Sequence, residues 1–140
     1  MKVYQSGDTY IAPKGSFFDG NVHIPGDFIV PPETHIWGSL DVDGRLELGA
    51  LSTVGKDVRC KSGVIGRSVR IKGALSVGEN VTISDNVIVK SVAAGGDIIL
   101  RPGIKVGEVK SDATIYVYGR ILSTRLIGRN VKVIGNQANQ

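Results

Sequence analysis

The side chains that most often carry catalysis or bind metals are scarce in this sequence. It contains two histidines, His23 and His35, and a single cysteine, Cys60. His23 lies between two apolar residues, so the alternation of a strand directs it outward, and His35 follows the turn-like stretch at residues 31–34. A metal site needs further acidic or His/Cys ligands, and no acidic cluster accompanies either histidine. We therefore expect ordinary surface or turn histidines and predict no metal site.

Cys60 is also expected to be structural rather than catalytic. It stands two residues after Val58 in an apolar phase, which favours a small buried hydrophobe. A nucleophilic cysteine needs an exposed position and a neighbouring base, and one cysteine cannot form a disulfide or a Cys-based zinc site within one chain. The sequence also lacks the Gly-x-x-x-x-Gly-Lys-Ser/Thr phosphate-binding motif. We predict no catalytic residues and no cofactor, and we expect that the protein is not an enzyme.

The most prominent polar feature is a run of basic residues in the middle of the chain. Arg59 and Arg70 occupy outward positions of short strands, and stacked strands would gather such residues into one patch that attracts phosphates. Exposed aromatic residues that stack on bases are not interleaved with this run, so no specific nucleic acid is expected. An anionic membrane surface is the partner considered, and a plain solvated face is the alternative. The candidate patch consists of Lys56, Arg59, Lys61, Arg67, Arg70 and Lys72.

The elements that position these residues are short strands in a six-residue repeat. From Leu40, a core position recurs every six residues to Val64; after a slip of one residue near Gly66, the steps resume at Val69 and continue to Val87. A second apolar residue usually follows two positions later, and the residue between the two is usually polar. This alternation is typical of a strand with one inward face. Three residues are too few for an ordinary hairpin strand, so the pattern favours a coil of short strands.

Glycine-containing turns separate the strands. Residues 54–60, 65–71, 77–83 and 127–133 share one motif, in which an apolar residue is followed by glycine and two polar residues. Three units make a turn of about 18 residues, and successive turns stack at the inter-strand spacing of ~4.8 Å. We predict an all-β, single-domain parallel β-helix, or β-solenoid, of about six turns. A β-sandwich with regularly spaced strands is the alternative.

The chain divides into three segments. Residues 1–20 are irregular and are expected to form an N-terminal arm or cap, residues 21–135 the β-helix, and residues 136–140 a flexible tail. No apolar stretch has the length of a signal peptide or approaches the ~20 residues of a membrane span. We expect a cytoplasmic location, and association with a membrane surface stays open. Charge is distributed unevenly along the chain: residues 1–50 carry a net charge of −4 and residues 51–140 a net charge of +8.

The two ends of a solenoid present unpaired strand edges and the top of an apolar core, which recruit further strands unless they are capped. Here the last repeat stops within a few residues of the C-terminus, and apolar residues gather near the N-terminus. The sequence therefore predicts nucleotide-independent, end-to-end self-assembly into a homopolymer, with head-to-tail and like-end joining both open. The candidate polymer interface consists of Phe17, Phe18, Phe28, Ile29, Ile127, Val131, Val133 and Ile134.

One resemblance covers most of the repeat region. Residues 37–49, with the glycine-valine units that follow them, resemble the bactofilins in repeat rhythm and glycine placement; their sequence is Trp-Gly-Ser-Leu-Asp-Val-Asp-Gly-Arg-Leu-Glu-Leu-Gly. Bactofilins are polymer-forming cytoskeletal proteins of bacteria and some archaea. The resemblance extends over roughly residues 20–135. It implies a right-handed, triangular β-helix that polymerises without nucleotide by joining like ends and scaffolds other proteins, often at the membrane.

Two further resemblances supply alternatives. Residues 96–100 and 115–122 are similar to the C-terminal β-helix of the division inhibitor MinC, which implies a dimer that needs a partner. The glycine-containing hexads also resemble left-handed hexapeptide-repeat acyltransferases, which implies a compact trimer with a catalytic histidine. Neither His23 nor His35 lies in the well-formed repeats where such a site would sit. A bactofilin-like structural protein is therefore the predicted function, with these two classes as its alternatives.

Overall fold

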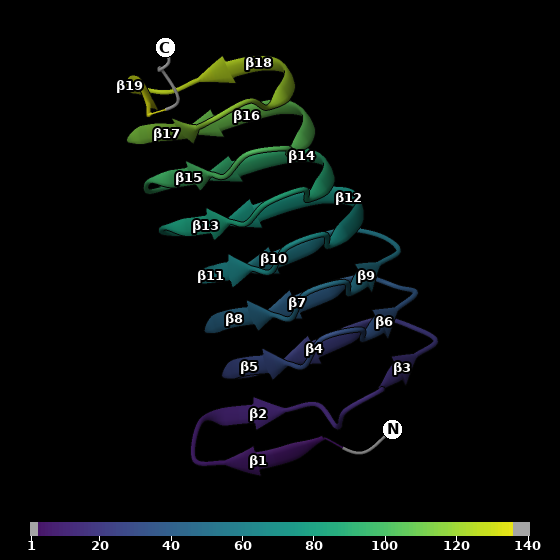
Figure 1. Ribbon diagram of the computed structural model, residues 1–140. Coiled ribbons are helices and arrows are strands. Elements are labelled where there is room, and N and C mark those ends of the chain that lie inside the picture. The colour runs from purple at the N-terminus through teal and green to yellow at the C-terminus, as the bar shows by residue number, and fades with distance from the viewer. Residues whose placement is uncertain (1–2, 136–140) are drawn as a thin grey trace.

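The computed structural model describes residues 3–135, which form one stack of β-strands (Figure 1). This range contains strands and turns and no helix. Strands of successive turns pair in parallel, and the one antiparallel pair in this range joins residues 4–6 to residues 9–11. The predicted all-β, single-domain parallel β-helix is confirmed, with about seven turns rather than about six. The tail expected at residues 136–140 lies outside the described residues.

Each turn has three sides, and the strands on each side stack into one face. Face A consists of β1 (Tyr4–Ser6), β2 (Thr9–Ile11), β5 (Asp27–Val30), β8 (Arg45–Leu48), β11 (Ser62–Ile65), β13 (Val81–Ile83), β15 (Ile98–Leu100), β17 (Thr114–Tyr118) and β19 (Asn130–Ile134). In the N-terminal half, face B consists of β4 (Val22–Ile24), β7 (Leu40–Val42) and β10 (Val58–Cys60). Face C there consists of β3 (Phe17–Phe18), β6 (His35–Ile36) and β9 (Thr53–Val54).

In the C-terminal half, faces C and B are joined by single long strands. These are β12 (Arg70–Val77), β14 (Ile88–Ala94), β16 (Lys105–Ser111) and β18 (Leu122–Ile127). The first part of β12 pairs with β9 on face C, and its last part pairs with β10 on face B. A register irregularity between Ile71 and Ala74 marks the corner between the two faces. The three-sided arrangement therefore persists along the whole stack.

The segment before residue 20 contributes three of these strands. β1 and β2 form an antiparallel hairpin at the N-terminal end of face A. β2 already pairs in parallel with β5, and β3 pairs in parallel with β6. The regular stack therefore begins at Thr9, and β1 is the strand that lies outside it.

The core is a column of aliphatic side chains that face inward from all three sides. The predicted inward residues Val58, Val69, Val81 and Ile83 are all buried. Val64, in contrast, does not face inward as expected: it is half-buried and aligns with the outward Glu47 on β8. The slip in the repeat therefore falls between β10 and β11, not near residue 66. Paired residues of β5 and β8, which precede this slip, are 18 positions apart in the sequence, whereas those of β8 and β11 are 17 apart.

At several corners, a side chain accepts a hydrogen bond from a backbone amide of the next turn. The Oδ1 atom of Asp57 accepts a hydrogen bond of 2.8 Å from the amide of Ala74. A Cβ atom on the preceding Gly73 would lie 2.7 Å from the carbonyl carbon of Lys56 and would also overlap Asp57 Oδ1. Only glycine therefore fits above this carboxylate. The same arrangement recurs at three further Asx–Gly pairs: Asn21 with Gly38, Asp27 with Gly44, and Asn80 with Gly96.

The corner from face A to face C is built differently. One residue in each of six successive turns has a left-handed backbone; these residues are Gly15, Glu33, Leu51, Ser68, Asn86 and Gly103. The amide of Leu51 donates to the carbonyl of Arg67, and the amide of Ser68 donates to that of Asp85. The left-handed conformation is unfavourable for a residue with a Cβ atom. Leu51, at φ 64°, therefore holds a conformation that only the ladder above and below it enforces.

The glycine requirement above Asp57 leads to a first prediction. Gly73→Ala should lower the free energy of unfolding by about 3 kcal/mol, because the new methyl group overlaps backbone atoms that the ladder holds in place. Gly78→Ala is the matched control, since a Cβ atom there meets nothing closer than 3.4 Å. Denaturant unfolding followed by circular dichroism measures both. Equal stability of the two variants would contradict the close approach at residue 73.

The left-handed corner leads to a second prediction. Leu51→Gly should raise the free energy of unfolding by about 0.5–1 kcal/mol, because it removes an unfavourable backbone conformation at a partly exposed side chain. Ile88→Gly, at a partly exposed aliphatic residue within a strand, should instead lower stability by about 1 kcal/mol. Thermal unfolding of the two variants beside the native sequence tests the pair. A loss of stability at residue 51 would show that the corner is not strained.

Candidate functional site

The C-terminal turn leaves the core open. Val131 and Val133 on β19 continue the inward columns of Ile115 and Val117 on β17. Ile115 is fully buried, whereas Val131 is 42% and Val133 is 70% exposed. β18 pairs only with β16, and β19 only with β17, so both have one unpaired edge at the end of the stack (Figure 1). Within the described residues, nothing covers this layer of aliphatic side chains.

The other C-terminal candidates surround this layer. Ile127 aligns with the outward Lys110 on face B, and Ile134 aligns with Tyr118 on the outside of face A. Both therefore lie beside the open core rather than in it. Sequence reasoning missed Leu126, which stacks on the buried Val109 and is only partly covered. Its i+17 relation to Val109 is the signal that would have found it.

The N-terminal end is closed on one face. Phe28 is fully buried, because Tyr10 on β2 is its stacking partner one turn below. Phe28 therefore belongs to the core and is not available to a terminal contact. Ile29 is half-buried on face A, and Phe18 packs partly against the core. Phe17 is exposed on face C, so the four N-terminal candidates do not share one surface.

The edge strand at the N-terminal end is β1. It pairs only with β2, so its other edge is unpaired (Figure 1). Tyr4 on β1 and Ile11 on β2 are aligned and are both exposed. On the other two faces, β3 and β4 are the first strands of the ladder. The two ends of the molecule therefore differ: an antiparallel hairpin ends face A at one, and an open parallel turn forms the other.

The six residues of the candidate basic patch do not share a face. Arg59 lies on face B between Asp41 and Ser76, and Arg70 lies on face C between Thr53 and Ile88. Both face outward, as predicted. Of the other four, Lys72 follows Arg70 along β12, whereas Lys56, Lys61 and Arg67 lie between strands, at corners. Residues lie together on one face of a solenoid when they are one full turn apart in the sequence. Residues that are only a few positions apart lie on different faces or corners instead.

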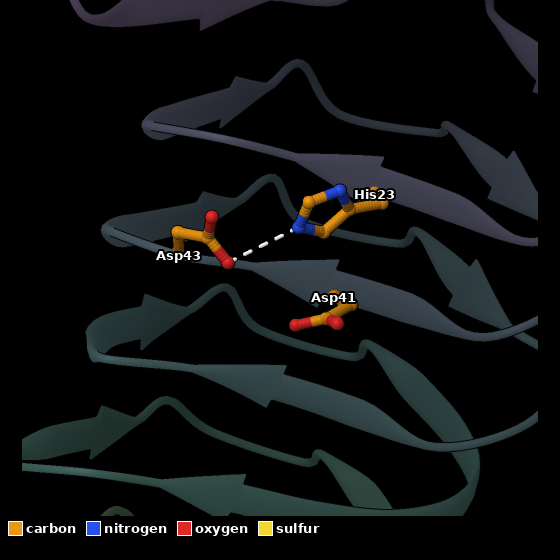
Figure 2. A group of neighbouring side chains, drawn as sticks. All are labelled: His23, Asp41 and Asp43. Carbon is orange, nitrogen blue, oxygen red and sulfur yellow. Dashed lines mark hydrogen bonds and ion pairs between the residues drawn. The ribbon is translucent and has the colours of Figure 1, made fainter.

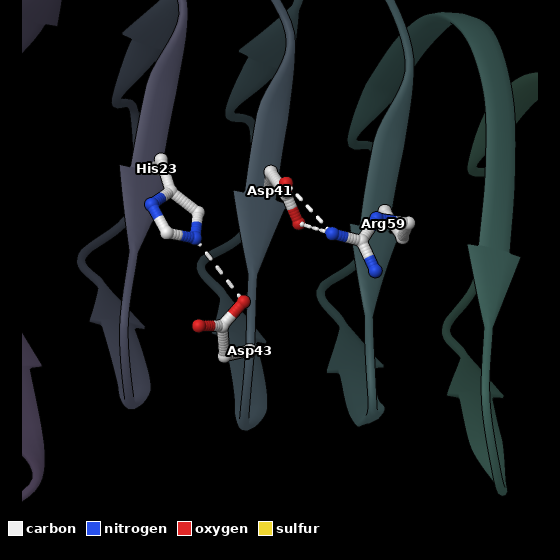
Figure 3. Close-up of polar contacts among 4 residues, drawn as sticks. All are labelled: His23, Asp41, Asp43 and Arg59. Carbon is white, nitrogen blue, oxygen red and sulfur yellow. Dashed lines mark hydrogen bonds and ion pairs between the residues drawn. The ribbon is translucent and has the colours of Figure 1, made fainter.

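On face B, Arg59 is held by an acid of the preceding turn. Its Nη2 atom donates to Oδ2 of Asp41 at 2.8 Å and lies 2.7 Å from Oδ1 (Figure 3). The hydrogen bond and the charge of Asp41 both raise the pKa of Arg59. This ion pair is exposed to solvent, so it contributes little to stability. Arg59 is therefore less available to an external phosphate than its sequence neighbourhood indicates.

The same stacking places a histidine beside two carboxylates. His23 on β4 aligns with Asp41 on β7, and its Nε2 atom lies 3.1 Å from Oδ1 of Asp43 (Figure 2). One ligand atom from each of the three residues lies within 4.8 Å of the others. The expectation that no acidic cluster accompanies the histidines is therefore wrong for His23. Asp41 and Asp43 are one turn away along the chain, which a local sequence pattern does not reveal.

This cluster offers three donors of the kinds that bind divalent transition metals. Its chemistry is limited by Arg59, because the guanidinium already occupies the carboxylate of Asp41 (Figure 3). A cation would have to displace that guanidinium and the contact between His23 and Asp43. His35 lies on face C, where its Nδ1 atom is 2.7 Å from Oγ1 of Thr53. The two histidines therefore do not form a joint site.

Cys60 is buried in the core of β10, as predicted for a structural residue. Its burial raises the pKa of the thiol from 9.0 to about 12. The thiolate is the reactive form of cysteine, so this thiol is suppressed as a nucleophile near neutral pH. Its position on the inward side of β10 also keeps it from an external substrate.

Comparisons with protein-family models, with curated proteins and with solved structures find no match for this chain. The resemblances to bactofilins, to MinC and to hexapeptide-repeat acyltransferases therefore stay predictions. No helix within residues 3–135 is long and apolar enough to cross a membrane.

The buried thiol leads to a third prediction. Cys60 should not react with a thiol reagent at pH 8 in the folded protein and should react fully after unfolding in urea. Between pH 9 and about 12 the unfolded chain loses the thiol proton while the folded chain keeps it. Stability should therefore fall with rising pH more steeply in the native sequence than in Cys60→Ala. Rapid labelling of the folded protein would contradict the burial of this residue.

Proposed function

We propose that this protein is a bactofilin-like structural building block that self-assembles end to end without nucleotide and scaffolds other proteins. The observation that carries this proposal is the open C-terminal turn. Val131 and Val133 occupy core columns yet are exposed, and the strands that hold them have an unpaired edge. A second copy seated there would bury these side chains and continue the ladder, so apolar burial and main-chain pairing act together.

A polymer needs a second joint, and the N-terminal hairpin supplies a candidate. The unpaired edge of β1 lies at the opposite end of the sheet that β19 ends. An incoming β19 would therefore meet a free strand edge with the exposed Tyr4 beside it. On the other two faces, β3 and β4 are the corresponding edge strands. This arrangement supports head-to-tail joining through the two different ends.

The charges near the two ends favour the same joint. Residues 119–135 contain four bases and no acid, whereas residues 3–34 contain four acids and one base. Two C-terminal ends brought face to face would place like charges together, which opposes association. The C-terminal end instead matches the acidic N-terminal region of another copy. Charge thus supports a polar filament, unlike the symmetric joining that the bactofilin resemblance implies.

A discrete dimer is the second candidate. It is favoured by the hairpin β1–β2, because this hairpin closes face A at one end and leaves only the C-terminal turn fully open. Two open turns joined around a twofold axis would bury the exposed valines without any further growth. Such an assembly fits the dimer that the MinC-like alternative implies. Size measurement separates the two candidates directly.

The open turn leads to a fourth prediction. Val133→Asp should reduce long polymers to monomers or short oligomers, because it places a charge in the apolar layer of the joint. The fold should persist, since residue 133 is 70% exposed in the single chain and solenoid turns depend chiefly on their neighbours. Sedimentation velocity and electron microscopy without nucleotide give the size. Circular dichroism checks that the variant stays folded.

The matched control for this experiment is Ser76→Asp. It makes the same charge change at an exposed outward position of face B, far from either end. We expect polymers of normal length from this variant. A native protein that is monomeric, or one that stops at a dimer, would contradict the filament proposal. Unchanged polymers from folded Val133→Asp would exclude the C-terminal turn as the joint.

A further inference from the structure

Face C carries several bases without an acidic partner, whereas one such base lies on the strands of each other face: Lys110 on face B and Lys132 on face A. Besides Lys56, four bases lie at outward positions of this face or of its corner with face B: Arg70, Lys72, Lys90 and Lys105. None of the four has a carboxylate within ion-pair distance among the described residues. Elsewhere on the stack, five bases are paired with acids: Arg45, Arg59, Lys61, Arg101 and Arg125.

Large apolar side chains stand among these bases. Ile88 stacks between Arg70 and Lys105, and Leu122 follows Lys105 in the same outward column. Leu122 is 65% exposed, and Ile88 is partly exposed. The outward side of face C therefore alternates between cations and aliphatic groups in its C-terminal half. The core does not need these aliphatic residues, because the inward positions of the same strands are filled by others.

Two aromatic residues complete the face at its N-terminal end. Trp37 is 65% exposed and packs edge to face against Phe17, with ring centroids 5.1 Å apart. A hollow of about 520 Å³ lies beside Trp37; it is lined by the tryptophan, Gly55, Thr53, Arg70 and Lys72, with Ile36 and Val54 beneath. A Cβ atom on Gly55 would overlap the backbone of Trp37. The glycine thus lets the turns stack closely here, and it leaves an open floor between an aromatic ring and two bases.

We propose that face C binds the surface of an anionic lipid bilayer. The four unpaired bases match the negative charge of lipid headgroups. Trp37 and Phe17 have the amphipathic or apolar character of residues that lie at a bilayer interface, and Ile88 and Leu122 bury their exposed area there. The strands of face C lie one above another along one side of the stack (Figure 1), and the outward column of Arg70, Ile88, Lys105 and Leu122 runs along them. A planar membrane can therefore contact all of them together.

The observations favour a membrane over a nucleic acid. A phosphate backbone would also attract the bases, but it offers nothing to Ile88 and Leu122. The aromatic residues are grouped at one end, with Trp37 packed against Phe17, whereas a single strand needs successive stacking platforms along its path. Face C and the two ends share the end strands β3, with Phe17, and β18, with Leu122. The four bases lie on β12, β14 and β16, away from both ends, so the proposal does not depend on self-assembly. The Val133→Asp variant can therefore be used to test membrane binding by monomers or short oligomers.

The experiment compares two variants of equal charge change. Vesicles of phosphatidylcholine alone, and of phosphatidylcholine mixed with phosphatidylserine, are sedimented with protein at low salt. We expect the native protein and Val133→Asp to bind only the mixed vesicles, and Lys72→Glu combined with Lys90→Glu to lose about tenfold or more in affinity. Lys61→Glu combined with Lys110→Glu alters face B and its corner with face A instead and should retain most of the binding. High salt should release the native protein.

A second readout reports on the face itself. Trp37 is the only tryptophan in the chain, so its emission should shift to shorter wavelength when mixed vesicles bind. Trp37→Ala should weaken binding while the circular dichroism spectrum stays the same. Equal losses from the two double variants, or binding without a shift in emission, would overturn the assignment to face C. Absence of binding to mixed vesicles, with an oligonucleotide bound instead, would overturn the membrane as the partner.

Discussion

The parallel hydrogen-bond ladder between successive turns is the interaction on which the rest of the structure depends. It fixes each residue against the one 16 to 18 positions away, so that Leu75 lies over Val58 and Val58 over Leu40. The aliphatic core follows from this alignment, because inward positions of all turns then share the same columns. The corners follow as well. The carboxylate of Asp57 can reach the amide of Ala74 only because the ladder sets both turns at one spacing.

The ladder also decides which residues can act together. Neighbours in the sequence turn away to other faces, whereas residues one turn apart are brought into contact. The basic run around Arg59 and Arg70 is spread over two faces for this reason, and His23 meets Asp41 for the same reason. A functional surface on such a fold is a row parallel to the axis. The membrane-binding surface that we propose on face C is such a row, and Arg70, Ile88, Lys105 and Leu122 follow one another in it at one-turn intervals.

Alternation of apolar and polar residues was sufficient to predict the fold class and most of the core, including Val69 and Val81. The register was harder, because a turn that is one residue shorter moves Val64 outward without changing the local pattern. The left-handed corner could not be predicted, since Leu51 has no preference for that conformation and takes it only through the ladder. The His23 cluster needed the register as well. A comparison of each Asp or Asn with the glycine 16 or 17 positions later would have supplied part of the register between turns.

A parallel ladder does not terminate by itself, because each turn leaves an unpaired strand edge with which a further turn can pair. A chain must therefore end it by some other element or leave it open. The described residues show both: β1 reverses direction at one end of face A, whereas β18 and β19 keep the parallel direction in the last described turn. The growth that we propose uses the two ends of this ladder, and the membrane contact that we propose uses one of its sides. The two parts meet at β3 and β18, which are the end strands of face C. The bases on β12, β14 and β16 lie between these strands, so the proposed joint leaves them free for the proposed membrane contact.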